Sequence, residues 1–207
     1  MSKVIKKTLY PKTIRIGKEE TNYFITEKLD GSNIGFFVLD GELYVAQRNN
    51  VYEASIISKE FAYKGLQQFL ADHDLASEIV EGAIIFGEWL GSGRLKYPNA
   101  TTRFYMFAKA RIDEKLNVTN MVYTPEFYKY AFNKQEIPNF MEVVPLVDTL
   151  KNKPSILHLD ALYDDYLEDV GRNVEGFVIT NGSTVEKYVR NVGKGVIEYK
   201  THARKGD

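Results

Sequence analysis

The chain has 207 residues, of which 44% are hydrophobic, with 27 basic and 28 acidic side chains and no cysteine. This length allows one good core, or one domain with a small appendage. The lack of cysteine excludes disulfides, thiolate metal sites and a cysteine nucleophile. The first ten residues lack an apolar signal core and no apolar run approaches membrane-spanning length, so we expect a soluble, cytoplasmic protein without a membrane partner.

Charge is balanced overall but unevenly distributed along the chain. Residues 160–169 hold five acids and no base, which is typical of a solvated helix face. Residues 186–205 hold six basic side chains against two glutamates, a net charge of +4. The six are Lys187, Arg190, Lys194, Lys200, Arg204 and Lys205. We interpret this basic stretch as a candidate phosphate-facing surface.

The hydrophobic pattern predicts hairpins mixed with isolated helices. Strands are expected at 22–28, 33–39, 42–48, 83–89, 103–110, 175–180, 184–190 and 195–200. Helices are expected at 55–71, 72–80, 124–135 and 155–169. This order indicates an α+β fold, and neither G-x-G-x-x-G nor G-x-x-x-x-G-K-[ST] is present to bind a nucleotide.

The tripeptide Leu-Asp-Gly occurs twice, at residues 29–31 and 39–41. The second copy lies between two apolar runs, which predicts a tight hairpin turn at Asp40-Gly41. The first copy is preceded by Glu27-Lys28 and followed by Ser32-Asn33, and a plain hairpin turn needs none of these residues. A lysine at a strand end can act as a nucleophile when its amine is neutral, although a surface lysine before a turn fits equally well.

Two further strand ends carry candidate side chains. The predicted hairpin brings Arg48 back toward the Lys28 end, where its planar guanidinium would suit phosphate oxygens; a solvated arginine is the alternative. Glu88 follows the apolar run at 83–86, and a buried carboxylate needs a partner such as a ribose hydroxyl, a cation or an arginine. The strand at 103–110 contains Phe104, Tyr105 and Phe107, of which one could stack on a base and at least one should be core.

The last part of the chain combines an acid with several cations. Glu175 opens a strand, Lys187 lies on the returning strand, and Lys200 ends a third. A carboxylate can hold Mg²⁺ and the cations can hold a triphosphate. An exposed polar hairpin with a basic tail is the alternative.

The order of these elements resembles that of the covalent nucleotidyltransferases, the ATP-dependent polynucleotide ligases and mRNA capping enzymes. The order is K-x-D-G, arginine, G-E, an aromatic strand, E-G-x-V and a lysine-ended strand, from about Tyr10 to Lys200. The run from Glu27 to Asn33 looks most like the phage-type RNA ligases, because DNA ligases and capping enzymes usually carry arginine where this chain has Asn33.

The resemblance implies one α+β nucleotidyltransferase domain over residues 1–207, with a short basic tail from about 201. Its antiparallel sheets would be flanked by helices, with a nucleotide groove between the sheets. It also implies an ATP-dependent RNA ligase that seals RNA 5′-phosphate to 3′-hydroxyl ends through a lysyl-AMP intermediate with Mg²⁺. The alternatives are a DNA ligase, a capping-type enzyme, or a nucleotide-binding module without turnover.

Carried over by position, the resemblance implies a role for each candidate residue. Lys28 would attack the α-phosphate of ATP and Lys200 would hold it, while Glu175 would position the metal. Asp30 of the K-x-D-G run is a secondary candidate. The implied nucleotide contacts are the adenine edge for Glu27, phosphate or ribose for Asn33 and Arg48, ribose for Glu88, and adenine stacking for Phe107.

Three features depart from the family pattern. Ala108 stands where RNA ligases often have aspartate, and the last motif has one lysine instead of two, with Lys187 as a rival to Lys200. Only seven residues follow Lys200, too few for the further C-terminal module of many ligases. The chain would therefore be a minimal ligase or only the nucleotidyltransferase domain of one.

Overall fold

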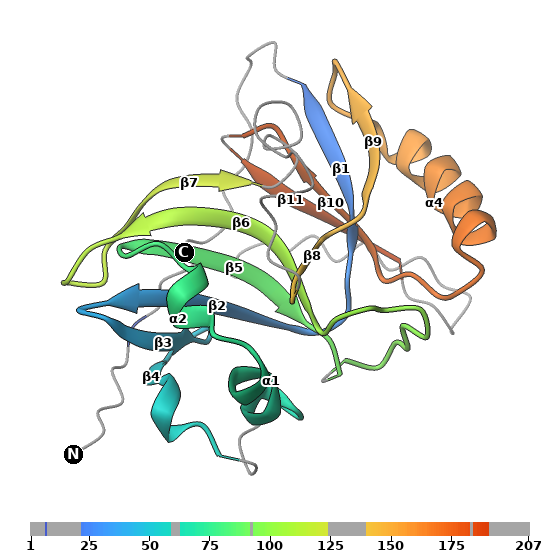
Figure 1. Ribbon diagram of the computed structural model, residues 1–207. Coiled ribbons are helices and arrows are strands. Elements are labelled where there is room, and N and C mark those ends of the chain that lie inside the picture. The colour runs from blue at the N-terminus through green and yellow to red at the C-terminus, as the bar shows by residue number, and fades with distance from the viewer. Residues whose placement is uncertain are drawn as a thin grey trace, which may run out of the picture. The chain divides into compact units, whose positions relative to one another are not determined.

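The computed structural model describes residues 7, 22–58, 63–91, 93–123, 140–182 and 184–190 (Figure 1). The chain divides into two compact units. Unit 1 comprises Met1–Thr13 and Asp30–Val144, and unit 2 comprises Ile14–Leu29 and Pro145–Asp207. The chain therefore passes from unit 2 to unit 1 inside the first Leu-Asp-Gly tripeptide.

Unit 1 is built on one sheet with the strand order β4-β3-β2-β5-β6-β7. These strands pair antiparallel, and the short β8 pairs parallel to β6. The strands are β2 (Ser32–Leu39), β3 (Glu42–Ala46), β4 (Val51–Glu53), β5 (Ala83–Trp89), β6 (Phe104–Ile112), β7 (Val118–Tyr123) and β8 (Glu142–Val143). The helices are the 3₁₀ turn η1 (Ala54–Ile56), α1 (Leu66–Asp72) and α2 (Leu75–Glu78).

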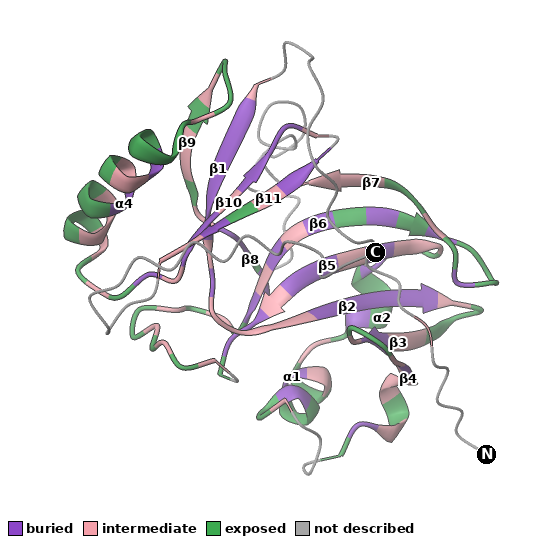
Figure 2. Cartoon of the chain, turned by 180° about the vertical axis from the view of Figure 1, so that it is seen from behind, coloured by how far each residue is buried: buried purple, intermediate pink, exposed green. Residues whose placement is uncertain are grey.

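Both faces of the unit 1 sheet are apolar, since β2 carries the consecutive residues Phe36 and Phe37 and each is fully buried. Phe36 packs with Trp89 and with Phe69 of α1 in a cluster that also includes α2. Phe37 packs with Phe86 in a second cluster on the opposite face. Figure 2 shows the buried stretches along β2, β5 and β6.

Unit 2 is a smaller antiparallel sheet with the order β11-β10-β1-β9 and one long helix. The elements are β1 (Tyr23–Lys28), β9 (Leu146–Leu150), α4 (Ile156–Val170), β10 (Gly176–Thr180) and β11 (Val185–Val189). Ser155 caps the start of α4 by accepting from the His158 amide, and Gly171 ends it with φ 60°. Leu159 and Tyr163 of α4 pack on Ile25 and Phe177, so α4 covers one face of this sheet.

The structure confirms most of the predicted strands and the helix at 155–169. The predicted helix at 55–71 is wrong, because the chain is extended at Ile57 and α1 begins only after Gly65, which adopts φ 83°. The helix at 72–80 shrinks to α2, because His73 is extended and Asp74 caps a new start. Strands β4, β7, β8 and β9 were not predicted.

The predicted helix at 124–135 and strand at 195–200 lie outside the described residues. No helix in the described ranges is long and apolar enough to cross a bilayer. That all 207 residues form a single domain stays a prediction.

Candidate active site

Lys28 is the last residue of β1 and lies opposite Gly176, the first residue of β10. This register places Lys28 beside Glu175, which directly precedes β10. Lys28 Nζ lies 2.5 Å from Glu175 Oε2, and the two side chains are 22% and 27% exposed. The predicted nucleophile is thus ion-paired with the predicted metal ligand, and both side chains are partly exposed to solvent.

Glu27, the preceding residue, points to the opposite face of β1 because side chains alternate along a strand. Its side chain is fully buried. Arg172 Nη1 and Nη2 donate to its two carboxylate oxygens at 2.6 and 2.7 Å, and the Tyr166 hydroxyl donates at 2.8 Å. Burial, together with the Glu27 charge, raises the pKa of the Tyr166 phenol.

One short loop supplies both ionic partners of β1. Arg172 and Glu175 lie in the segment that follows Gly171 and leads into β10. Glu27 pairs with Arg172 on the α4 side, and Lys28 pairs with Glu175 on the other side. Two ion pairs therefore hold the end of β1, and β1 supplies the carboxylate of one pair and the amine of the other.

Arg172 was not among the residues selected from the sequence, and neither was Tyr166. A signal was available, because Arg172 is the only lysine or arginine between Lys153 and Lys187 and follows an acidic helix. The adenine contact expected of Glu27 stays a prediction. A nucleotide bound at Lys28 would lie across the sheet from the Glu27 carboxylate.

Lys187 lies on the same face of the unit 2 sheet as Lys28. It is exposed on β11 and pairs with Val178 of β10, which in turn pairs with Thr26 of β1. Thr26 and Lys28 share a face because they are two residues apart. The predicted Lys200 lies outside the described residues.

In unit 1, Asn33 and Glu88 lie directly opposite each other on β2 and β5. They share the face of Phe37 and Phe86, since all four follow the two-residue period of their strands. Arg48 is exposed two residues beyond Ala46, which pairs with Gly35, so it lies at the same end of the sheet as Asn33.

Phe107 is the extra residue of a bulge in β6, because Phe86 pairs with Ala108 and Gly87 with Met106. Its half-buried ring packs against the Phe37 cluster. Phe104 is fully buried on the other face, as expected for a core residue. Strand β6 thus carries one core aromatic, Phe104, and one half-buried aromatic, Phe107.

The first Leu-Asp-Gly is a tertiary junction. The Asp30 carboxylate accepts from the main-chain amides of Arg94 and Leu95 at 2.6 and 2.9 Å, and the Asp30 amide donates to the Tyr97 hydroxyl at 2.6 Å. The Gly31 amide donates to Glu88 Oε1 at 3.0 Å. A side chain at Gly31 would meet the Trp89 carbonyl, so the close approach requires glycine.

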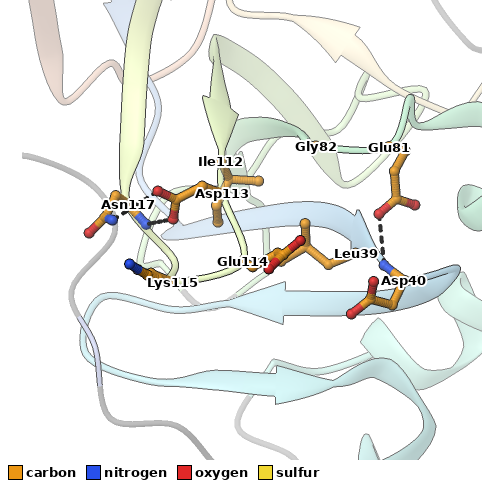
Figure 3. A pocket seen from close by; sticks show the side chains of 9 residues that line it. All are labelled: Leu39, Asp40, Glu81, Gly82, Ile112, Asp113, Glu114, Lys115 and Asn117. Carbon is orange, nitrogen blue, oxygen red and sulfur yellow. Dashed lines mark hydrogen bonds between the residues drawn. The ribbon is translucent and has the colours of Figure 1, made fainter.

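The second Leu-Asp-Gly is a hairpin turn, as predicted. Asp40 and Gly41 have φ values of 52° and 74°, and Leu39 pairs with Glu42 across the turn. The turn borders a pocket of about 490 Å³ between the β2–β3 and β6–β7 connections (Figure 3). The pocket presents Asp40, Glu81 and neighbouring acids, which would repel phosphate, so we do not assign the nucleotide to it.

The described residues contain no group of three acidic, histidine or cysteine side chains that could hold a metal ion. Mg²⁺ commonly binds through one or two carboxylates and the phosphates of its substrate. Glu175 fits that kind of site, since its carboxylate is partly exposed beside the predicted nucleophile.

A protein-family model described as RNA ligase matches residues 21–196 of the chain. The chain belongs to the RNA ligase family. The span matched by the RNA ligase model includes Lys28, Glu88, Glu175 and Lys187 and ends before Lys200. No curated protein matches the chain.

Solved RNA ligase structures have the same fold. One structure of Naegleria gruberi RNA ligase with ATP and Mn has a TM-score of 0.54 and 19% identity, over 83% of this chain and 50% of that one. Another structure of the same ligase with ATP and Mn has a TM-score of 0.56 and 18% identity, over 82% of this chain and 50% of that one. A third structure, with PPi, has a TM-score of 0.51 and 17% identity, over 83% of this chain and 50% of that one. The chain thus spans about half the length of these RNA ligases.

We expect the two tripeptide aspartates to differ in their effect on stability. Asp30→Asn weakens two charge-assisted bonds to main-chain amides and should lower the free energy of unfolding by about 1–2 kcal/mol. Asp40→Asn keeps a residue that tolerates positive φ and should change it by less than about 0.5 kcal/mol. Urea unfolding of both variants measures the difference, and equal losses would contradict the distinction between junction and turn.

We also expect buried and exposed ion pairs in unit 2 to differ in how much they contribute to the free energy of unfolding. Arg172→Ala leaves the fully buried Glu27 without its cation and should cost about 3–5 kcal/mol. The matched control is Lys153→Ala, which removes the exposed pair with Glu186 and should cost less than about 1 kcal/mol. A small loss for Arg172→Ala in thermal and chemical unfolding would show that Arg172 is not needed to hold Glu27.

Proposed function

We propose that this chain is the nucleotidyltransferase part of an ATP-dependent RNA ligase, with Lys28 as its nucleophile. The observation that carries the proposal is the partly exposed Lys28, fixed at the end of β1 beside Glu175 in a chain of the RNA ligase family. The first product would be a lysyl-AMP phosphoramidate, and RNA ends would be the final substrates. The cytoplasmic location expected from the sequence stays a prediction.

In the first step the lone pair of Lys28 Nζ forms a bond to the α-phosphorus of ATP. The bond from that phosphorus to the oxygen bridging the α- and β-phosphates breaks, and pyrophosphate leaves. Nζ must first lose a proton, because only the neutral amine carries the lone pair that attacks.

Two transfers complete the proposed reaction. A 5′-phosphate oxygen of RNA attacks the phosphorus of lysyl-AMP, the N–P bond breaks, and Lys28 recovers its amine. A 3′-hydroxyl then attacks the activated 5′-phosphate, an O–P bond forms, and AMP leaves. Glu175 would hold Mg²⁺, which would offset the charge of the α-phosphate.

For the nucleotide we propose contacts in unit 1 from Asn33, Arg48, Glu88 and Phe107. Three observations support this set. Asn33 and Glu88 are direct neighbours across β2 and β5, Arg48 lies at the same end of the sheet, and Phe107 shares their face. Glu88 also accepts from the Gly31 amide, three residues after the nucleophile. The proposed adenine contact of Glu27 has less support than this set, because the Glu27 carboxylate is already bound by Arg172.

The test of this function is the intact mass of the protein after incubation with ATP and Mg²⁺. We expect an increase of one AMP in the wild type and none in Lys28→Ala, because the other described lysines lack the Glu175 partner. Adding 5′-phosphorylated RNA should remove the increase. An increase that persists in Lys28→Ala would show that Lys28 is not the nucleophile.

The lysine that contacts the α-phosphate is proposed to be Lys187 or Lys200. The order of motifs favours Lys200, whereas the shared face with Lys28 supports Lys187. By strand spacing Lys187 lies about 10 Å across and about 7 Å along the sheet from Lys28, within reach of one phosphate group. We expect Lys187→Ala to slow single-turnover lysyl-AMP formation by roughly 10²–10³. A larger defect in Lys200→Ala would assign the contact to Lys200.

A further inference from the structure

The residues Gly93–Tyr97, here called the basic loop, are fixed to Asp30. The Asp30 carboxylate binds the main-chain amides of Arg94 and Leu95, and the Tyr97 hydroxyl accepts from the Asp30 amide. A side chain at Gly93 would collide with the Asp30 carbonyl, so glycine is needed for the contact. These contacts hold the loop in one position.

The fixed loop presents two free cations. Arg94 and Lys96 are exposed, and neither side chain has a hydrogen-bond or ion-pair partner in the described part of the chain. The Asp30 carboxylate engages the Arg94 amide and leaves the guanidinium unused. Residues 90–103 contain no acid that would neutralise these charges.

Two more cations extend this surface. Arg103 Nη1 donates to the Lys64 carbonyl at 2.9 Å and lies against Gly65 and Gly91, close to the start of the basic loop. The side chains of Lys64 and Arg103 are both exposed. We refer to Lys64, Arg94, Lys96 and Arg103 together as the basic surface.

The basic loop is bound to a residue that closely follows the proposed nucleophile in the sequence. Asp30 follows Lys28 by two residues, and two residues of chain span at most about 7 Å. The loop is thus bound to the same K-x-D-G run that contains Lys28.

We propose that Arg94 and Lys96 bind backbone phosphates of the RNA strand that receives AMP, an inference that rests on the proposed function. A triphosphate is compact and would be enclosed by a few convergent groups. Four exposed cations spread over a surface instead fit an extended polyanion, for which charge neutralisation supplies most of the affinity. The surface selects phosphate and carries no base specificity.

The test measures binding of a fluorescent 5′-phosphorylated single-stranded RNA by anisotropy at several salt concentrations, without ATP. Two lost contacts on single-stranded RNA should reduce the slope of log affinity against log salt by about 1.4 in Arg94→Ala/Lys96→Ala. That slope corresponds to a loss of affinity of roughly 25-fold at about 0.1 M salt. Because this binding needs no chemistry, it tests the loop even if the wild type forms no lysyl-AMP.

Two control variants separate position from charge. Arg94→Lys/Lys96→Arg keeps both charges and should keep most of the slope. Arg111→Ala/Lys115→Ala removes two exposed charges at the far end of β6, about 26 Å from Arg103 by strand rise, and should leave the slope unchanged. An equal loss in this second control, or no loss in Arg94→Ala/Lys96→Ala, would overturn the proposal.

A second measurement distinguishes RNA from the triphosphate of ATP. In the Arg94→Ala/Lys96→Ala variant, transfer of AMP from preformed lysyl-AMP to limiting RNA should fall by about the same 25-fold as binding. The ATP dependence of lysyl-AMP formation should match that of Arg111→Ala/Lys115→Ala. A raised ATP requirement with unaltered RNA binding would show that the loop binds the triphosphate, and the RNA proposal would be wrong.

Discussion

The placement of Lys28 depends on the alternation of side chains along β1. Glu27 and Lys28 are adjacent, so one must face α4 and the other must face away. The buried pair of Glu27 with Arg172 decides which, because a one-residue slip would put an unpaired lysine into the core under α4. The structure thus uses a buried carboxylate to direct the neighbouring amine outward.

The two ion pairs of β1 differ in energy, and the difference suits their positions. Breaking the buried pair would leave a desolvated charge, at a cost of about 3–5 kcal/mol. The pair of Lys28 with Glu175 is partly exposed, and such pairs contribute only about 0–1 kcal/mol. The inner pair therefore stays closed while the outer pair can open for a substrate, and one loop after α4 supplies both partners.

The doubled tripeptide shows how far local sequence carries a structural prediction. Asp40-Gly41 forms the predicted turn because its conformation depends only on its own residues and the flanking strands. Asp30-Gly31 depends on the loop at 93–97 and on Glu88, which are distant in sequence. The flanking Glu27, Lys28 and Asn33 distinguished the first copy from the second, but nothing local indicated these partners.

The same division applies to the rest of the fold and the site. The buried strand at 83–89 and the capped helix at 155–169 were predictable from apolar runs and capping residues. The helix at 55–71 was not, because the left-handed Gly65 and the extended Ile57 interrupt an apolar pattern that suits a helix. The register that places Asn33 beside Glu88, and the pairing of Arg172 with Glu27, are tertiary features that no single segment encodes.

The central claim is that the Lys28 amine, held outward beside Glu175, is the group that becomes adenylylated. Its most direct test is a peptide map of the wild-type protein after reaction with ATP and Mg²⁺, digested near neutral pH to preserve the phosphoramidate. The account predicts that AMP lies on the peptide containing Lys28, with fragment ions that place it on that side chain. AMP on another lysine, with the Lys28 peptide unmodified, would contradict it.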